Sequence, residues 1–138
     1  MLNLHKTRFR VIYGDTDKMG FAYYGTYMRW FEIGRTEMFR QLGLAYKTIE
    51  EKGIFLPVSE AYCKYLASVH YDMMLIIETS LDLKVKGAVK FNYRLLSEDE
   101  QTVHAKGYTK HACVNEKGRV VRPPGFLAEM FAKLTNSS

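Results

Sequence analysis

Cysteine, proline and long apolar runs are scarce in this sequence. Its two cysteines, Cys63 and Cys113, have no close cysteine partner, and no group of His and Cys has the spacing of a zinc site. No apolar run approaches the roughly 18 residues that a membrane-spanning helix needs. Residues 1–10 are partly basic but lack the apolar core of a secretory signal. We therefore expect a cytoplasmic protein without disulfides, a bound metal or a membrane span.

A strong charge of one sign is also missing. The 138 residues include 20 Lys and Arg against 15 Asp and Glu, which gives a net charge of +5 spread along the chain. Because there is no Lys/Arg block, the sequence lacks the basic arm typical of nucleic-acid binding, and we expect no nucleic-acid partner. The positive balance still favours anionic ligands or partners. With 47% hydrophobic residues, the composition predicts one globular domain over residues 1–138.

The longest helical pattern lies in residues 13–44, after a short polar turn. Its large apolar residues and one glycine repeat at helical spacing and form one face: Tyr27, Trp30, Phe31, Gly34, Met38 and Leu42. Arg29, Thr36 and Arg40 form the opposite face, while Met28 and Phe39 widen the apolar one. An apolar face this wide is typical of a helix that a curved sheet wraps.

Most of the remaining chain has the pattern of strands. Strands are predicted at residues 7–13, 54–67, 75–85, 89–95 and 102–114, with turns at 86–87, 97–100 and 115–118. In the first strand we expect Phe9, Val11 and Tyr13 to form the buried face, and Pro57 indicates that the second strand is an edge strand or bulged. Gly43 predicts the end of the long helix, and shorter helical segments are predicted at 45–52 and 126–134. Together these elements predict an α+β fold.

The polar turn before the long helix contains the first candidates for chemistry. A helix N-terminus presents unpaired backbone N–H groups and a partial positive charge, so it can hold an oxyanion. Asp15 or Asp17, on a turn that folds back over this terminus, could act as a base or a nucleophile. Aspartates in turns also commonly accept the hydrogen bonds that close the turn, so both interpretations stay open at this point.

Several motifs together carry a family resemblance. Residues 13–20 read YxDTDxxG, and the following aromatic and charged residues are Tyr23, Tyr24, Tyr27, Trp30, Glu32 and Arg35. Further motifs are CKYL at 63–66, YD at 71–72, GYTKHACV at 107–114 and RPP at 122–124. With these motifs the chain resembles, over nearly its whole length, the hot-dog-fold acyl-CoA thioesterases of the 4-hydroxybenzoyl-CoA and Tol-Pal-associated branch.

The resemblance implies a fold, an assembly and a reaction. It implies a curved antiparallel sheet wrapped around the central helix, subunits that pair edge to edge, and acyl-CoA sites at the subunit interface. Because a small curved sheet around one helix leaves its edges and one face uncovered, we expect a homodimer, with two dimers forming a homotetramer. The family's catalytic carboxylate falls on Asp17, three residues before Gly20, and the backbone N–H that polarises the thioester carbonyl falls on Tyr24. The implied reaction is hydrolysis of a small aliphatic or aromatic acyl-CoA. No cofactor is implied, because coenzyme A is part of the substrate.

Departures from the family pattern leave alternatives open. Tol-Pal-associated members often have His at the position of Tyr24, so the acyl group stays unsettled. An acyl-carrier-protein thioesterase and a non-catalytic acyl-CoA-binding protein both remain possible, whereas a hot-dog dehydratase needs a His that residues 14–25 lack. Another branch uses a helix glutamate, but Glu32 and Glu37 are expected to pair with arginines three residues later, on the surface. His70 and His111 are expected to be structural.

The remaining expectations concern substrate binding. Tyr23, Tyr27 and Trp30 could line an acyl or aryl pocket, although core packing is the usual role of aromatic residues on a helix face. Basic residues on the polar sides of neighbouring strands could bind the phosphates of coenzyme A: Lys84, Lys86, Lys90 and Arg94, with Lys106 and Lys110 as additions. The alternative for this basic group is a solvated sheet face that keeps the protein soluble.

Overall fold

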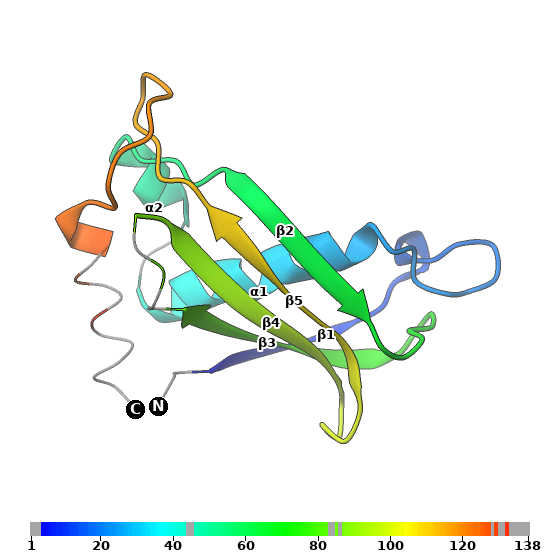
Figure 1. Ribbon diagram of the computed structural model, residues 1–138. Helices are drawn as coiled ribbons and strands as arrows, with labels where there is room; N and C mark the ends of the chain where they lie inside the picture. Colours follow the sequence, from blue (N-terminus) through cyan, green and yellow to red (C-terminus); the bar gives the residue numbers. More distant parts are fainter. Residues whose placement is uncertain are drawn as a thin grey trace.

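The computed structural model describes residues 4–43, 46–82, 85, 87–127, 129 and 132. In this part of the chain, an antiparallel sheet of five strands curves around one long helix, α1 (Figure 1). The strands lie in the order β1-β3-β4-β5-β2, and their bounds are β1 His5–Arg10, β2 Val58–Tyr65, β3 Met74–Asp82, β4 Val89–Ser97 and β5 Val103–His111. The predicted α+β arrangement is therefore confirmed.

Helix α1, Thr26–Gln41, packs its aromatic face against the concave side of the sheet. The ring of Phe31 stacks on that of Tyr93 from β4, with centroids 4.3 Å apart and an interplanar angle of 4°. A Cβ atom at Gly34 would lie 2.3 Å from the Thr79 hydroxyl oxygen and 2.9 Å from an Ile77 side-chain carbon. The glycine is therefore what lets the helix backbone come this close to β3.

Strand β4 follows the predicted alternation. Its inner residues Val89, Phe91, Tyr93 and Leu95 are all buried. Strand β3 differs, because all its residues from Leu75 to Leu81 are buried, including Glu78 on the outer face. Arg94 covers that carboxylate, with its Nε and Nη2 donating to the two oxygens at 2.7 and 3.1 Å. The outer face of the sheet thus contains a buried carboxylate with a half-exposed arginine partner, as well as solvated side chains.

The first strand ends earlier than predicted. Strand β1 stops at Arg10, and Tyr13, which was expected on the buried face, lies in a short 3₁₀ helix (η1, Tyr13–Asp15) with 80% of its surface exposed. The cause is a polar turn. The Ile12 N–H donates to the Asp15 carboxylate at 3.0 Å, and the Asp15 N–H donates to the Ile12 carbonyl at the same distance.

Strand β2 is shorter than the predicted 54–67 and lies at the edge of the sheet, next to β5. Its pairing is irregular between Val58 and Glu60, so the edge and the bulge expected near Pro57 both occur. The fifth strand is also shorter than the predicted 102–114. Val114 instead forms isolated bridges with Phe55 and Val120.

The shorter helical segments lie where the sequence predicted them, and glycines mark the helix ends. Helix α2, Tyr46–Glu51, lies between Gly43 and Gly53, which both have φ +81°, the left-handed conformation that glycine adopts after a helix end. The described residues of the predicted 126–134 segment are helical. Among the described residues, no helix has both the length and the apolar character needed to cross a membrane.

Candidate active site at the start of helix α1

The turn before α1 is held to the helix by Asp15. The residue is only 3% exposed, and both of its carboxylate oxygens are bound, one by the Ile12 N–H and the other by Arg29 of α1. Its carbonyl accepts from the Tyr23 N–H at 3.0 Å and from the Thr26 hydroxyl at 3.3 Å. Asp15 is therefore a structural residue that brings the turn back to the helix start.

Asp17 has a different environment, in an exposed loop that projects from the body of the fold (Figure 1). Its Oδ1 accepts from the Met19 and Phe21 N–H groups at 2.9 and 3.2 Å. Gly20, with φ +83°, closes the turn by donating its N–H to the Asp17 carbonyl at 3.0 Å. The other carboxylate oxygen, Oδ2, has no partner among the described residues. The turn thus orients Asp17 through one oxygen and leaves the second one available.

The first turn of α1 lacks the usual side-chain cap. Gly25 occupies the N-cap position, and the first turn contains no acidic residue. The Tyr23 and Tyr24 carbonyls accept from the Thr26 and Tyr27 N–H groups at 2.9 and 3.3 Å. The N–H groups of Tyr24 and Gly25 have no hydrogen-bond partner within the described part of the chain. These donors lie at the positive end of the helix and are available to an oxyanion.

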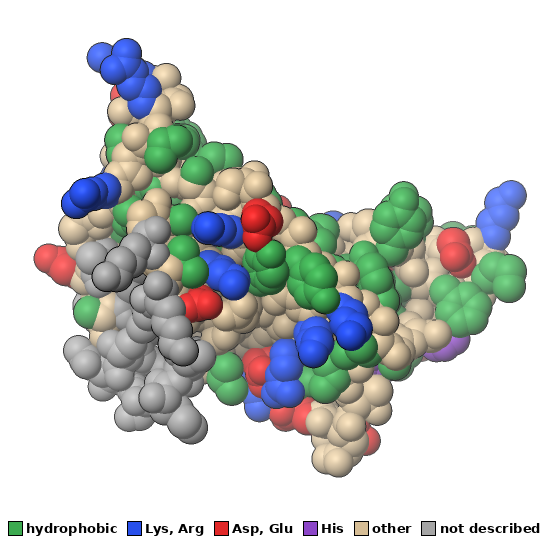
Figure 2. Space-filling view, in the orientation of Figure 1, with side chains coloured by type: hydrophobic (Ala, Val, Ile, Leu, Met, Phe, Trp, Pro, Cys, Tyr) green, Lys and Arg blue, Asp and Glu red, His purple; other side chains and the backbone are tan. Residues whose placement is uncertain are grey.

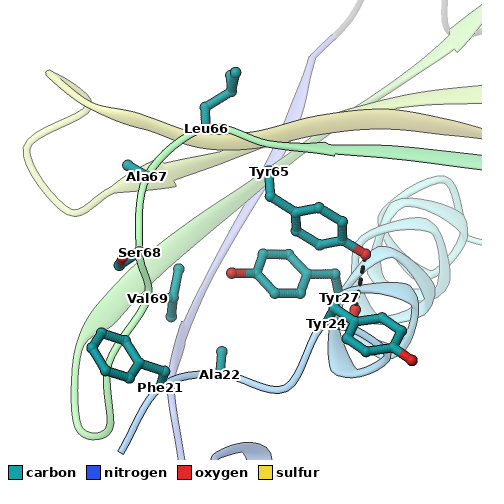
Figure 3. A pocket seen from close by; sticks show the side chains of 9 residues that line it. All are labelled: Phe21, Ala22, Tyr24, Tyr27, Tyr65, Leu66, Ala67, Ser68 and Val69. Atoms are coloured by element: carbon teal, nitrogen blue, oxygen red, sulfur yellow. Dashed lines mark hydrogen bonds between the residues drawn. The ribbon is translucent and has the colours of Figure 1, made fainter.

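Beside these donors is a cavity of about 430 Å³ with a mainly apolar and aromatic lining (Figure 3). It is formed by the loop before α1, the first turn of α1 and the chain that leaves β2: Phe21, Ala22, Tyr24, Tyr27, Tyr65, Leu66, Ala67, Ser68 and Val69. The rings of Tyr27 and Tyr65 meet edge to face, with centroids 4.7 Å apart. Burial raises the pKa of the Tyr27 phenol to about 12, so this wall of the cavity is uncharged at neutral pH.

The structure brings together only some of the predicted site residues. Tyr24 and Tyr27 line the cavity. Asp17 and Gly20 are in the loop, and Tyr23 is exposed with its ring 4.6 Å from that of Tyr24. Trp30 lies in the core, 5.3 Å from the Phe9 ring, and does not line the cavity.

Sequence reasoning missed the segment 65–69, which supplies one wall of the cavity. Tyr65 belongs to the inner face of β2, since Tyr62 and Lys64 alternate with it and pair in register with outer-face residues of β5. That alternation was available in the sequence. The contact of this segment with the start of α1 was not, because it depends on how the sheet curves.

The predicted phosphate-binding residues that the structure describes lie on the outer face of the sheet, opposite α1. Lys90 lies 3.8 Å from an Asp82 carboxylate oxygen and 4.3 Å from the centre of the Tyr108 ring, and Arg94 binds Glu78. Lys84 and Lys86 lie outside the described residues. Figure 2 shows Lys and Arg side chains gathered with hydrophobic ones over this face.

The strand register adds a feature that the sequence did not reveal. Lys64 of β2 pairs with Lys106 of β5, which pairs in turn with Arg94 of β4. We call these three residues the cationic row. Like charges directly opposite one another in a sheet are destabilising, and within the described part of the chain only Arg94 of the three has a carboxylate partner. The row therefore favours a bound anion.

A buried chain of hydrogen bonds runs from α1 through β4 and β5 to the carbonyl of Leu56. Arg35 donates to the Tyr93 hydroxyl at 3.4 Å, the Tyr93 and Thr109 hydroxyls are 2.6 Å apart, and Thr109 is 2.9 Å from Nε2 of His111. His111 Nδ1 lies 2.8 Å from the Leu56 carbonyl, so the ring donates there and accepts from Thr109. His111 is fully buried, and this burial lowers the pKa of its imidazole to about 4.

The helix glutamates form the predicted pairs, with one correction. Glu37 binds Arg40, and a Glu32 oxygen lies 3.8 Å from Arg35. Arg35, however, is buried and also bonds Tyr93, so it is a core residue and not the surface partner that was expected. His70 is exposed, and its ring contacts that of Phe21, with centroids 4.6 Å apart. Within the described residues, no group of three His, Cys, Asp or Glu could hold a metal ion.

Comparison with known proteins finds relatives over most of the chain. The thioesterase-like superfamily matches residues 11–133. The acyl-CoA thioesterase YbgC of Haemophilus influenzae is 34% identical over 108 residues, which cover 77% of each chain. The structure of DHNA-CoA thioesterase from Staphylococcus aureus is 26% identical with a TM-score of 0.87, and the match covers 96% of this chain and 91% of that one.

A more distant structure tests the predicted fold. A 4-hydroxybenzoyl-CoA thioesterase variant in complex with 4-hydroxybenzoyl-CoA is 19% identical, with a TM-score of 0.80 over 93% of this chain and 98% of that one. At this identity the likeness concerns the fold alone. The curved five-stranded sheet around one long helix is the hot-dog fold, as the resemblance implied.

Proposed function

This chain belongs to the thioesterase-like superfamily, and we propose that it hydrolyses the thioester bond of a small aliphatic or aromatic acyl-CoA. The products are the free acid and coenzyme A. The observation that carries the proposal is the uncapped start of α1, where Tyr24, whose N–H has no partner among the described residues, lines an aromatic cavity of about 430 Å³. The names of the similar acyl-CoA thioesterases support the same reaction.

In the proposed mechanism, the thioester carbonyl oxygen accepts a hydrogen bond from the Tyr24 N–H. Negative charge develops on this oxygen as the carbonyl carbon becomes tetrahedral, and the positive end of α1 stabilises it. One such donor is typically worth about 3–4 kcal/mol in acyl transfer. Tyr27 forms part of the wall against which the acyl group packs.

Asp17 is the proposed carboxylate. Its free oxygen can attack the carbonyl carbon, expelling the coenzyme A thiolate and forming a mixed anhydride that water then cleaves. Alternatively, it can take a proton from a water molecule that attacks the carbon directly. Both routes need one available carboxylate oxygen, which Asp17 has and Asp15 lacks. The chemistry needs no cofactor beyond the coenzyme A of the substrate.

The proposed site is shared between copies of the chain. Asp17 does not line the cavity within one chain, and β2 is an edge strand next to that cavity. We propose a homodimer in which Asp17 of one copy serves the cavity of the other, with two dimers forming a tetramer. An exposed edge strand favours such pairing, because its backbone groups otherwise lack partners.

The nucleotide end of coenzyme A is proposed to bind the outer face of the sheet. Lys64 of the cationic row follows Tyr62 on the outer side of β2, directly beside Tyr65 of the cavity. The pantetheine arm would pass around this edge and bring the phosphates to Lys64, Lys106 and Arg94, with Lys90 nearby. Lys84 and Lys86 stay candidates for the same role.

A second candidate function uses the same basic face. An acyl carrier protein is acidic and presents its acyl group on the same pantetheine arm, so this face suits it as well. Comparing kcat/KM for one acyl group on coenzyme A and on carrier protein separates the two functions.

Turnover of a panel of aliphatic and aromatic acyl-CoAs, measured by the release of thiol, tests the proposed function. Saturable binding without turnover of any of them would instead indicate an acyl-CoA-binding protein.

A further inference from the structure

Tyr65, the last residue of β2, contacts the start of α1 at two points. Its hydroxyl donates to the Tyr24 carbonyl at 3.2 Å, and its ring meets the Tyr27 ring edge to face at 4.7 Å (Figure 3). Tyr27 is itself buried, with its ring 4.9 Å from that of Trp30. The phenol of Tyr65 is thus fixed between the edge of the sheet and the helix start.

This hydrogen bond acts on a turn that the Asp15 carbonyl also holds, through the Tyr23 N–H and the Thr26 hydroxyl. Among the described residues, Tyr65 is the one side chain that hydrogen-bonds the backbone of residues 23–25, and the helix start has no side-chain cap. The helical bond to the same carbonyl, from the Tyr27 N–H, is long at 3.3 Å. Tyr65 therefore adds a second donor where the first is weak.

The held carbonyl is connected to both unpartnered donors. It belongs to the same residue as the Tyr24 N–H, so fixing it limits how that N–H can turn. It also belongs to the same peptide group as the Gly25 N–H. That peptide is trans, so its N–H points away from Tyr65 and out of the helix start. A hydrogen bond to a carbonyl polarises its peptide and strengthens the N–H as a donor.

We propose that Tyr65 is a positioning residue for the thioester site, which orients the oxyanion donors at residues 24 and 25 through its hydrogen bond to the Tyr24 carbonyl. The effect of Tyr65 on catalysis rests on the proposed function. Tyr65 itself touches no reacting atom in this role. Burial, and then the neighbouring Cys63, raise the pKa of the Tyr65 phenol, so it keeps the proton that it donates at neutral pH.

Tyr65→Phe is the direct test, because it removes the hydroxyl and keeps the ring on Tyr27. Tyr62→Phe is the matched control. Tyr62 lies three positions earlier in β2 on the outer face, its exposure of 46% matches the 47% of Tyr65, and its hydroxyl has no partner among the described residues. We expect kcat to fall about 5-fold or more in Tyr65→Phe, the effect of one neutral hydrogen bond, with KM within about 2-fold. Tyr62→Phe should match the wild type.

Amide chemical shifts provide a readout that does not need activity. In ¹H–¹⁵N spectra, the Gly25 amide should move in Tyr65→Phe and stay in place in Tyr62→Phe, because only the first change removes a bond to its peptide group. Wild-type protein that hydrolyses no thioester would overturn the proposed function, while the Gly25 shift would still decide whether Tyr65 holds this turn. An unmoved Gly25 amide, an unchanged kcat, or equal kcat losses in the two variants would overturn the positioning role.

Discussion

Replacing His111 with Gln tests the buried hydrogen-bond chain through its effect on acid stability. His111 is fully buried, donates to the Leu56 carbonyl and accepts from Thr109, and its ring must be neutral to do both. Arg35 lies at the other end of the chain and further disfavours a positive charge on the ring. Glutamine has an amide donor and acceptor but takes up no proton in this pH range.

The size of the effect follows from the pKa of His111. Burial lowers this pKa from 6.5 to about 4, and each pH unit of difference corresponds to about 1.4 kcal/mol. The folded state therefore loses about 3 kcal/mol relative to the unfolded state as the ring becomes charged. Because the folded pKa is the lower one, the unfolded chain binds the proton first. The stability is fully present above pH 6.5 and is lost progressively as the pH falls toward 4.

Urea unfolding between pH 7.5 and 4.5 measures this loss for the wild type, His111→Gln and His70→Gln. His70 is an exposed histidine, so His70→Gln serves as the control. Carboxylates titrate in all three proteins, so the difference between the curves isolates His111. His111→Gln should be less stable than the wild type at pH 7.5 and should lose about 2.5 kcal/mol less on acidification to pH 4.5. Parallel curves for the wild type and His111→Gln would refute the neutral buried ring.

Three further predictions concern the nucleotide end, the assembly and the helix packing. A short pantetheine thioester should show a higher KM than the matching acyl-CoA. Added salt should narrow this difference in KM, and so should the double substitution Lys64→Ala with Lys106→Ala. Equal KM values for the two substrates in the wild type would refute phosphate binding by the basic face. Sedimentation should give a dimer or tetramer at micromolar concentration, and a fully active monomer would refute the shared site. Gly34→Ala should lower the free energy of unfolding by about 1–3 kcal/mol, because the added methyl group would overlap Thr79. Gly125 has open space around it, so Gly125→Ala should change the free energy of unfolding little. Urea unfolding measures both variants.

Local periodicity explains what could be predicted from the sequence. The apolar face of α1 and the inner face of β4 repeat at 3.6 and 2 residues, and both were confirmed, because each depends only on near neighbours in the chain. Tyr13 was misplaced because a polar turn at Ile12 and Asp15 overrides an alternation that otherwise continues. A side-chain hydrogen bond of this kind leaves no periodic signal.

The site was harder to predict than the fold, since it joins segments that are distant in sequence. The motif placed the helix start and its aromatic residues, and Tyr24 and Tyr27 do line the cavity. The contact of Tyr65 with Tyr24 spans 41 positions and depends on the curvature of the sheet. Likewise, only the folded turn distinguishes Asp15, with both oxygens bound, from Asp17, with one oxygen free.

The central claim is that Asp17 is the carboxylate of a thioester hydrolase. Asp17→Asn keeps the oxygen that accepts from the Met19 and Phe21 N–H groups, so the turn should persist while the charge and the nucleophile are lost. Asp15→Asn is the comparison. It weakens the ion pair with Arg29 and should lower stability, with a much smaller effect on turnover of the folded protein.

Steady-state hydrolysis of the best acyl-CoA from the panel by the folded Asp17→Asn protein is the measurement that tests this claim most directly. The account predicts that kcat falls by at least about 100-fold, the scale of losing a general base, while KM changes little because the cavity and the basic face bind the substrate elsewhere. A folded Asp17→Asn protein with near-normal turnover would contradict it, as would equal kcat losses in Asp17→Asn and Asp15→Asn.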